Sequence, residues 1–417
     1  MHAPQSVTHP TVALAGIVTY LMMTALDYAF HPFGDNIVLS AIWLITTTGL
    51  AIFAVDSLGQ HVHLRASTGL DPNQRQPSWA RTATKYVGLL GSIGFVGLLY
   101  WLFPEYHGAF YGQFYQALRY VMPVWLMLAI PYFYYIDRAM VQPKDGYWHL
   151  GQILLLRWEN VDRAVLGQHI LTWTIKGYFL PLMFTYLCTD LNWLRQVQLT
   201  SQTTHIQFHA IAYRFIFYID VGLATLGYIA SLRLFDTHVR SAEPTMLGWV
   251  VALVCYEPFW SQLISRQYIN YQTGLFWNSW LQDVPVIPWL WSAAILLCSV
   301  IYVWATVMFG ARFSNLTHRG ILTNGPYRWS KHPAYLAKNL SWWLISVPFV
   351  VQGSLAEALR TCLLLLALNG IYYLRARTEE MHLGRDPDYV RYAGWIQQHG
   401  LFRFMARRHL TKQHPAQ

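Results

Sequence analysis

The segment ILTNGPYRWSKHPAY occupies residues 321–335, and a later apolar run at residues 356–374 continues directly into RARTEE at positions 375–380. Two polar segments therefore flank one hydrophobic hairpin. Ionisable groups beside a membrane are costly to keep, so they usually have a function. A short turn between the apolar runs would bring both polar segments together, and the pattern predicts a hairpin with a functional site at one end.

The composition predicts a polytopic α-helical membrane protein. Hydrophobic residues make up 54% of the 417 residues and charged residues only 12%, whereas a soluble domain carries about 25% charged residues. The 19 tryptophans and 27 tyrosines exceed what a core needs, but they suit aromatic belts at the two membrane interfaces. The four cysteines lie singly in apolar runs, so neither a disulfide framework nor a zinc site is predicted.

A transmembrane helix needs about 20 mostly apolar residues. Ten runs meet this requirement, namely 12–30, 37–55, 86–103, 119–136, 171–189, 210–231, 246–265, 286–309, 333–350 and 356–374. The run 171–189 is the weakest, because it contains Lys176 and Pro181. The first run has no Lys or Arg before it and no small-residue cleavage site after it, which favours a retained span over a signal peptide. The expected fold is an all-α transmembrane helical bundle of about ten spans.

The distribution of Lys and Arg between alternate loops predicts the orientation of these spans. Loops on one side hold 23 of the 29 Lys and Arg residues, and loops on the other side hold 2. Positively charged loops stay in the cytoplasm, so we expect both termini and both polar segments there, in a bacterial inner (plasma) membrane. The net charge of +9 then reflects topology and contact with membrane lipids, and nucleic-acid binding is not indicated.

The first polar segment reads as a turn followed by a helix start. Residues 325–327, Gly-Pro-Tyr, are typical of a tight turn. Pro333 suits the first turn of the next helix, where its missing N–H costs nothing. The free N–H groups of that helix start, with Arg328 and Lys331 beside them, would suit an anionic group such as a carboxylate.

Both polar segments supply acids and bases at helical spacing. His332 can hydrogen-bond a ligand, and Tyr335 lies on the same helical face about one turn on. Across the hairpin, Arg375 and Glu379 are four residues apart, and Glu380 points about 100° away from Glu379. Each feature alone also fits a plain helix start or an intrahelical salt bridge. Their joint spacing across one hairpin favours a binding site.

Together with Tyr389 and Tyr392, these segments resemble the isoprenylcysteine carboxyl methyltransferase family, and phospholipid N-methyltransferases share the pattern. The resemblance covers roughly residues 285–404. It implies that S-adenosylmethionine binds at the cytoplasmic face and that a lipidic or prenyl-like acceptor reaches the methyl group from within the bilayer. It also divides the chain into residues 1–285, an amino-terminal transmembrane region of about seven spans and unknown role, and residues 286–417, a methyltransferase-like membrane domain.

The resemblance implies specific site residues by motif. The cofactor site would comprise Tyr327, Arg328, Lys331, His332, Pro333, Tyr335, Arg377, Glu379 and Glu380. The catalytic contacts would be His332, Arg375 and Glu380. The chain departs from the family pattern at Lys331 and Ala337, where Arg and Gly are usual.

Methyl transfer from a sulfonium is an in-line displacement, in which the protein mainly aligns the reactants and excludes water. No metal and no nucleophilic side chain is required, and none is evident. A carboxylate acceptor needs no general base, whereas an amine or hydroxyl acceptor does, and His332 or Glu380 could serve. The acceptor and the oligomeric state stay open.

Two other functions are compatible with the sequence. Sterol reductases use a similar His-Pro-x-Tyr segment but bind NADPH, and they typically carry Asp-Glu-Arg where this chain has Thr378-Glu379-Glu380. A non-catalytic lipid-binding or transport protein would show no cofactor affinity. Asp220 is the most isolated polar residue of the amino-terminal spans, and it fits either a substrate chamber or an interhelical hydrogen bond.

Overall fold

The computed structural model describes residues 4–403 except 72, 74–75, 199, 201–202, 266–267, 273–275, 282–283 and 352. The polar tail 404–417, which the predicted orientation places in the cytoplasm, lies outside the described residues.

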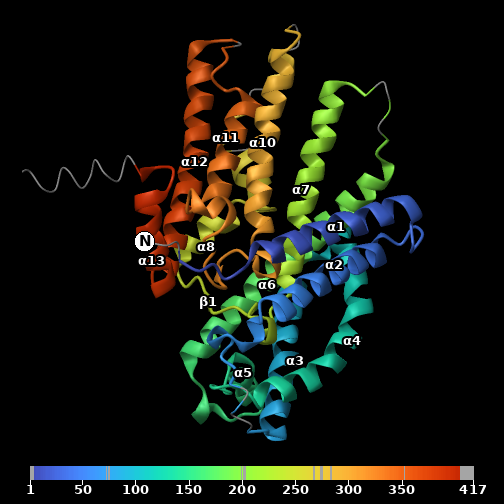
Figure 1. Cartoon of the computed structure of the whole chain (residues 1–417), viewed down its shortest axis with the longest axis vertical. Coiled ribbons are helices and arrows are strands. Elements are labelled where there is room, and N and C mark those ends of the chain that lie inside the picture. The colour runs from blue at the N-terminus through green and yellow to red at the C-terminus, as the bar shows by residue number, and fades with distance from the viewer. Residues whose placement is uncertain are drawn as a thin grey trace, which may run out of the picture.

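Helices make up nearly all of the regular structure in the described residues, which confirms the predicted all-α membrane bundle (Figure 1). The helices are α1 (Pro10–Phe30), α2 (Ile37–Ala54), α3 (Trp79–Leu102), α4 (Gly112–Asp137), α5 (Gly146–Leu154), α6 (Arg163–Gln196), α7 (His205–Ile229), α8 (Met246–Leu253), α9 (Trp277–Trp280), α10 (Ile287–Val307), α11 (Pro333–Ser346), α12 (Leu355–Leu383) and α13 (Pro387–His399). Two short strands, β1 (Ser241–Ala242) and β2 (Thr317–His318), pair in antiparallel fashion.

Within the described chain, seven helices are long and apolar enough to cross a bilayer, namely α1, α2, α3, α4, α7, α10 and α12. The expected count of ten is not confirmed, because three of the ten runs do not form such a helix. The run 171–189 lies in α6, which is continuous over 34 residues but less apolar than the seven. The run 246–265 is interrupted where α8 ends at Leu253, and the run 333–350 forms the short helix α11.

Helix α11 is too short to cross the hydrocarbon core alone. Its 14 residues span about 21 Å at 1.5 Å per residue, whereas the core is about 30 Å thick. The helix ends at Ser346, and Val347 adopts a left-handed backbone with φ of 36°. Pro348 follows directly, and a proline disfavours helical backbone in the residue before it.

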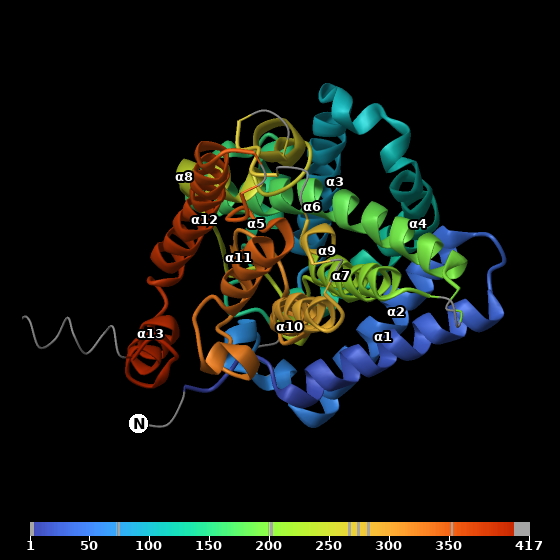
Figure 2. The same ribbon diagram turned by 90° about the horizontal axis from the view of Figure 1, so that it is seen from above.

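Helix α7 joins the amino-terminal helices to the carboxyl-terminal hairpin. It packs against α6 on one side and α10 on the other, and α10 in turn packs against α11. Helices α7, α10 and α12 run in similar directions, whereas α1 and α2 lie across them (Figures 1 and 2). The hairpin that carries the polar segments is therefore supported by the amino-terminal region.

Arg319 anchors the connection between α10 and α11 to the end of α7. Its buried guanidinium donates hydrogen bonds to the carbonyl oxygens of Gly227 at 2.7 Å and Thr237 at 2.8 Å, and also to that of Ala230. The last carbonyls of a helix lack partners within the helix, and a cation there complements the helix dipole. A Cβ at Gly227 would lie 2.2 Å from the carbonyl oxygen of Phe313, so glycine permits this close approach.

Two further contacts fix the same connection. Arg312 forms an ion pair with Asp56, with Nη1 and Oδ2 3.0 Å apart, and both side chains are only 1% exposed. The amino-terminal segment 4–9 lies along residues 321–324. Its bonds include Val7 N to the Ile321 carbonyl at 2.9 Å and Asn324 Nδ2 to the Thr8 carbonyl at 2.7 Å. The backbone just before the Gly325 turn is thereby held from both sides.

We expect Arg319→Met to lower the free energy of unfolding by on the order of 3 kcal/mol, because the buried carbonyls at the end of α7 would lose their donors. Thermal unfolding in detergent measures the change. Arg157→Met is the control, because Arg157 is exposed. Equal melting temperatures for the two variants would show that the Arg319 bonds contribute little.

Candidate functional site

A pocket lies where the connection 309–322 meets α8, α10, α11, α12 and α13. Six of the predicted site residues line it, namely Tyr327, Lys331, His332, Tyr335, Arg375 and Glu379. Among the described residues, its lining does not include Arg328, Pro333, Arg377 or Glu380. Pro333 is the first residue of α11, as the sequence predicted, and Arg328 is exposed.

His332 lies between the two predicted glutamates of α12. Its Nε2 is 3.1 Å from Oε1 of Glu380, and its Nδ1 is 3.6 Å from Oε2 of Glu379. The Tyr335 hydroxyl donates a hydrogen bond to Glu379, and the rings of His332 and Tyr335 are nearly parallel with centroids 5.5 Å apart. The hairpin thus brings the two polar segments together as predicted, with α11 and α12 side by side (Figures 1 and 2).

Glu380 lies outside the pocket lining but contacts Lys331 and His332, which line the pocket. Its Oε1 is 2.5 Å from Lys331 Nζ and 3.1 Å from His332 Nε2. Its Oε2 lies 3.2 Å from Nη1 of Arg377, whose side chain is 55% exposed. The carboxylate is therefore a bridge between the start of α11 and the last turns of α12.

Arg375 is buried at the centre of the pocket wall. Its Nη2 donates to Oδ1 of Asn315 at 2.6 Å, its Nε is 3.7 Å from Glu379 Oε1, and its guanidinium lies 5.1 Å from the Tyr335 ring centroid. Asn315 also donates from Nδ2 to the hydroxyl of Tyr256 at 2.9 Å. Neither Asn315 nor Tyr256 could be found from the sequence, because neither belongs to a recognisable motif and their approach depends on the fold.

Helix α13 completes the pocket with the two predicted tyrosines. The Tyr392 hydroxyl donates to the backbone carbonyls of Tyr327 at 2.7 Å and Ser330 at 3.3 Å, which fixes the turn. In the described part of the structure, the buried Tyr389 hydroxyl and Arg375 Nε have no hydrogen-bond partner, and both residues line the pocket. Buried polar groups normally find partners, so these atoms are suited to hydrogen-bond a ligand.

The pocket is narrow in this conformation. It holds about 170 Å³, whereas small-molecule sites typically hold about 300–1,000 Å³. The contacts of His332 and Tyr335 with the glutamates draw α11 against α12 across it. A ligand of ordinary cofactor size therefore requires these side chains to separate.

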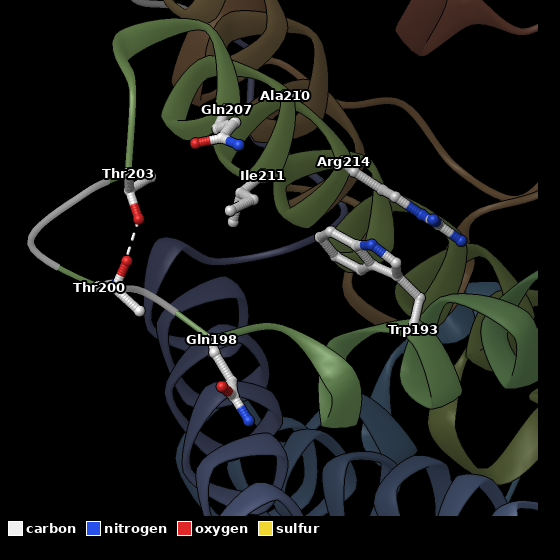
Figure 3. Close-up of a pocket in the computed structure, with 8 residues that line it drawn as sticks. All are labelled: Trp193, Gln198, Thr200, Thr203, Gln207, Ala210, Ile211 and Arg214. Carbon is white, nitrogen blue, oxygen red and sulfur yellow. Dashed lines mark hydrogen bonds between the residues drawn. The ribbon is translucent and has the colours of Figure 1, made fainter.

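A second pocket lies between the end of α6 and the start of α7 (Figure 3). It holds about 440 Å³ and contains none of the predicted site residues. Its charged side chain, Arg214, lies 4.4 Å from the Trp193 ring and forms an ion pair with Asp190 at 2.8 Å. Because this charge is already neutralised, the pocket between α11 and α12 is the better candidate.

The fold and this pocket define a multi-pass α-helical membrane protein with a pocket of polar residues on a helical hairpin. Residues 286–385 match the model of the Isoprenylcysteine carboxyl methyltransferase (ICMT) family. The match contains α10, α11 and α12 and ends before α13, so the resemblance is confirmed over these residues. Neither a curated protein nor a solved structure matches the chain.

We expect His318 on β2 to make stability depend on pH. Burial lowers the pKa of His318 from 6.5 to about 4, although its Nε2 lies 3.1 Å from Asp386 Oδ2. The unfolded chain therefore binds a proton more readily than the folded chain between these values, and stability falls as pH is lowered through them.

The test is the melting temperature between pH 6.5 and pH 4. His318→Asn should show a smaller decrease than the unsubstituted protein, whereas His399→Asn should not, because His399 is exposed. An unchanged slope in His318→Asn would contradict the assignment.

Proposed function

We propose that the protein is an integral-membrane methyltransferase that uses S-adenosylmethionine and acts on a lipidic or prenyl-like acceptor at the cytoplasmic membrane face. The match to a methyltransferase family and the seven apolar helices support the enzyme class and its location in a membrane. The observation that carries the proposal is the convergence of His332, Tyr335 and Glu379 on one pocket within the matched residues.

The residues of the pocket fit such a cofactor. S-adenosylmethionine supplies a methyl group on a positively charged sulfur. The Arg375 guanidinium suits a carboxylate, because arginine offers paired donors. Glu379 suits an ammonium or hydroxyl groups, and the unpartnered Tyr389 hydroxyl offers a further hydrogen bond. The aromatic faces of Tyr327 and Tyr335 suit a positive charge.

The other predicted residues would position these cofactor contacts or accept a proton. Glu380, Lys331 and Arg377 position the start of α11 against α12. A carboxylate acceptor requires no base, whereas an amine or hydroxyl acceptor would release a proton to His332 or Glu380.

The proposed orientation follows from the asymmetry of Lys and Arg between loops. It places the start of α11 and the end of α12 at the cytoplasmic face of a bacterial inner membrane. A water-soluble cofactor would then enter from the cytoplasm, and the acceptor would come from the lipid phase.

We expect S-adenosylhomocysteine, but not NADPH, to bind the purified protein in detergent with micromolar affinity. Calorimetric titration measures both ligands. His332→Ala and Glu379→Ala should abolish binding in variants that still unfold cooperatively, because these side chains line the pocket. Glu357→Ala is the matched control at the exposed start of the same helix. Binding of NADPH alone would favour a reductase, and binding of neither ligand would favour a non-catalytic lipid-binding or transport protein.

A reporter fused after Gly353 should appear on the non-cytoplasmic side. The 29 residues of α12 span about 43 Å, enough to cross the hydrocarbon core. A fusion at the carboxyl terminus should report the cytoplasm. A cytoplasmic signal at Gly353 would show that the hairpin enters and leaves on the same side.

A further inference from the structure

Lys338 is a cation in the pocket that the proposed cofactor contacts do not use. It lies on α11, one turn after Ala334, and lines the pocket with Tyr302 and Tyr372. Its Nζ lies 5.2 Å from the Tyr302 ring, 5.5 Å from the Trp342 ring and 5.8 Å from the Tyr372 ring. Its ammonium forms no hydrogen bond or ion pair with any residue that the structure describes.

The acidic side chains near Lys338 already have other partners. Asp220, on α7, is 8% exposed and accepts hydrogen bonds from the Thr306 hydroxyl at 2.5 Å and the Tyr302 hydroxyl at 3.2 Å. Glu379 accepts from Tyr335 and pairs with Arg375. Neither carboxylate forms an ion pair with Lys338 in the described structure.

An ionisable side chain on a membrane-embedded helix is costly unless it is paired, and such residues usually mark a substrate or ion site. Aromatic faces stabilise an ammonium only in part. The aromatic rings therefore compensate only part of the positive charge of Lys338. The ammonium lies beside the pocket, where an anion could compensate the rest.

The depth of Lys338 separates it from the polar start of α11. Lys338 lies five positions after Pro333, the first residue of α11, which corresponds to about 7.5 Å along the helix. Leu336 and Leu340, two positions before and after Lys338, lie on the opposite face of the same helix and are 42% and 54% exposed, as expected of a face that meets lipid tails. Lys338 is on the pocket side of the helix, so an amphiphile that enters the pocket brings its headgroup within reach of the ammonium.

We propose that Lys338 binds the anionic headgroup, a carboxylate or a phosphate, of the amphiphile that enters this pocket. This inference rests on the proposed function when the amphiphile is taken to be the methyl acceptor. It makes Lys338 a specificity-determining residue that selects anionic amphiphiles over neutral or cationic ones. Asp220 holds Tyr302 against the ammonium and so positions it.

The test compares four probes with the same chain: oleate, oleyl phosphate, oleyl alcohol and oleylamine. Each competes with a fluorescent fatty acid for the purified full-length protein in a neutral detergent that carries saturating S-adenosylhomocysteine. We expect at least one anionic probe to bind about tenfold more tightly than the alcohol, as for a charge-assisted hydrogen bond. A preference for oleate alone identifies a carboxylate, and a preference for oleyl phosphate alone identifies a phosphate.

Substitutions test whether Lys338 causes the preference. Lys338→Gln should remove it and Lys338→Arg should retain it, which separates loss of charge from loss of folding. Lys176→Gln is the matched control, because Lys176 also lies in a helix beside an aromatic ring, 5.8 Å from Trp173, but does not line the pocket. The proposal would be overturned if the alcohol or the amine bound as tightly as both anionic probes. It would also be overturned if Lys338→Gln still preferred an anionic probe.

The two proposals fail separately. Titration of the unsubstituted protein with S-adenosylhomocysteine alone tests the cofactor. If that ligand does not bind but the anionic preference is present and depends on Lys338, the methyltransferase proposal is wrong and the anion site stands. If S-adenosylhomocysteine binds but the anionic preference is absent, the anion-site proposal is wrong and the cofactor proposal stands.

Discussion

The guanidinium of Arg319 at the carboxyl end of α7 is the contact on which the pocket depends. The connection 309–322 forms one wall of that pocket, and few regular backbone bonds hold it because β2 is only two residues long. Arg319 replaces them with side-chain bonds to the carbonyls of Gly227, Ala230 and Thr237. The amino-terminal region, whose sequence carries no recognisable motif, is thus part of the scaffold that shapes the site.

The hairpin joins its two arms through charge and not through apolar packing alone. His332, Lys331 and Tyr335 from the first arm meet Glu379 and Glu380 from the second. Inside a low-dielectric environment such contacts are strong when satisfied and costly when they are not. A ligand that enters must offer these groups equivalent partners, which favours a polar, doubly charged molecule over an apolar one.

The sequence predicted the all-α class and the meeting of the two polar segments, because the first follows from composition and the second from a short turn between two apolar runs. Its count of ten spans is not confirmed, because a run such as 333–350 has the right composition but its helix ends before Pro348. Asn315 and Arg319 could not be predicted as site or scaffold residues, because their partners lie about 60–90 residues away in sequence. Their roles come from packing, which a periodic pattern does not encode.

The segment 4–9 has a consequence for biosynthesis. It hydrogen-bonds to residues 321–324, yet more than 300 residues separate the two partners, many of them in helices that must first enter the membrane. At about 5–20 residues per second, synthesis of the intervening chain takes roughly 15–60 s. During that time the segment has no site to occupy, and the pocket wall stays incomplete. The protein therefore matures late, because the segment 4–9 reaches its final position only after the hairpin near the other end of the chain has been made.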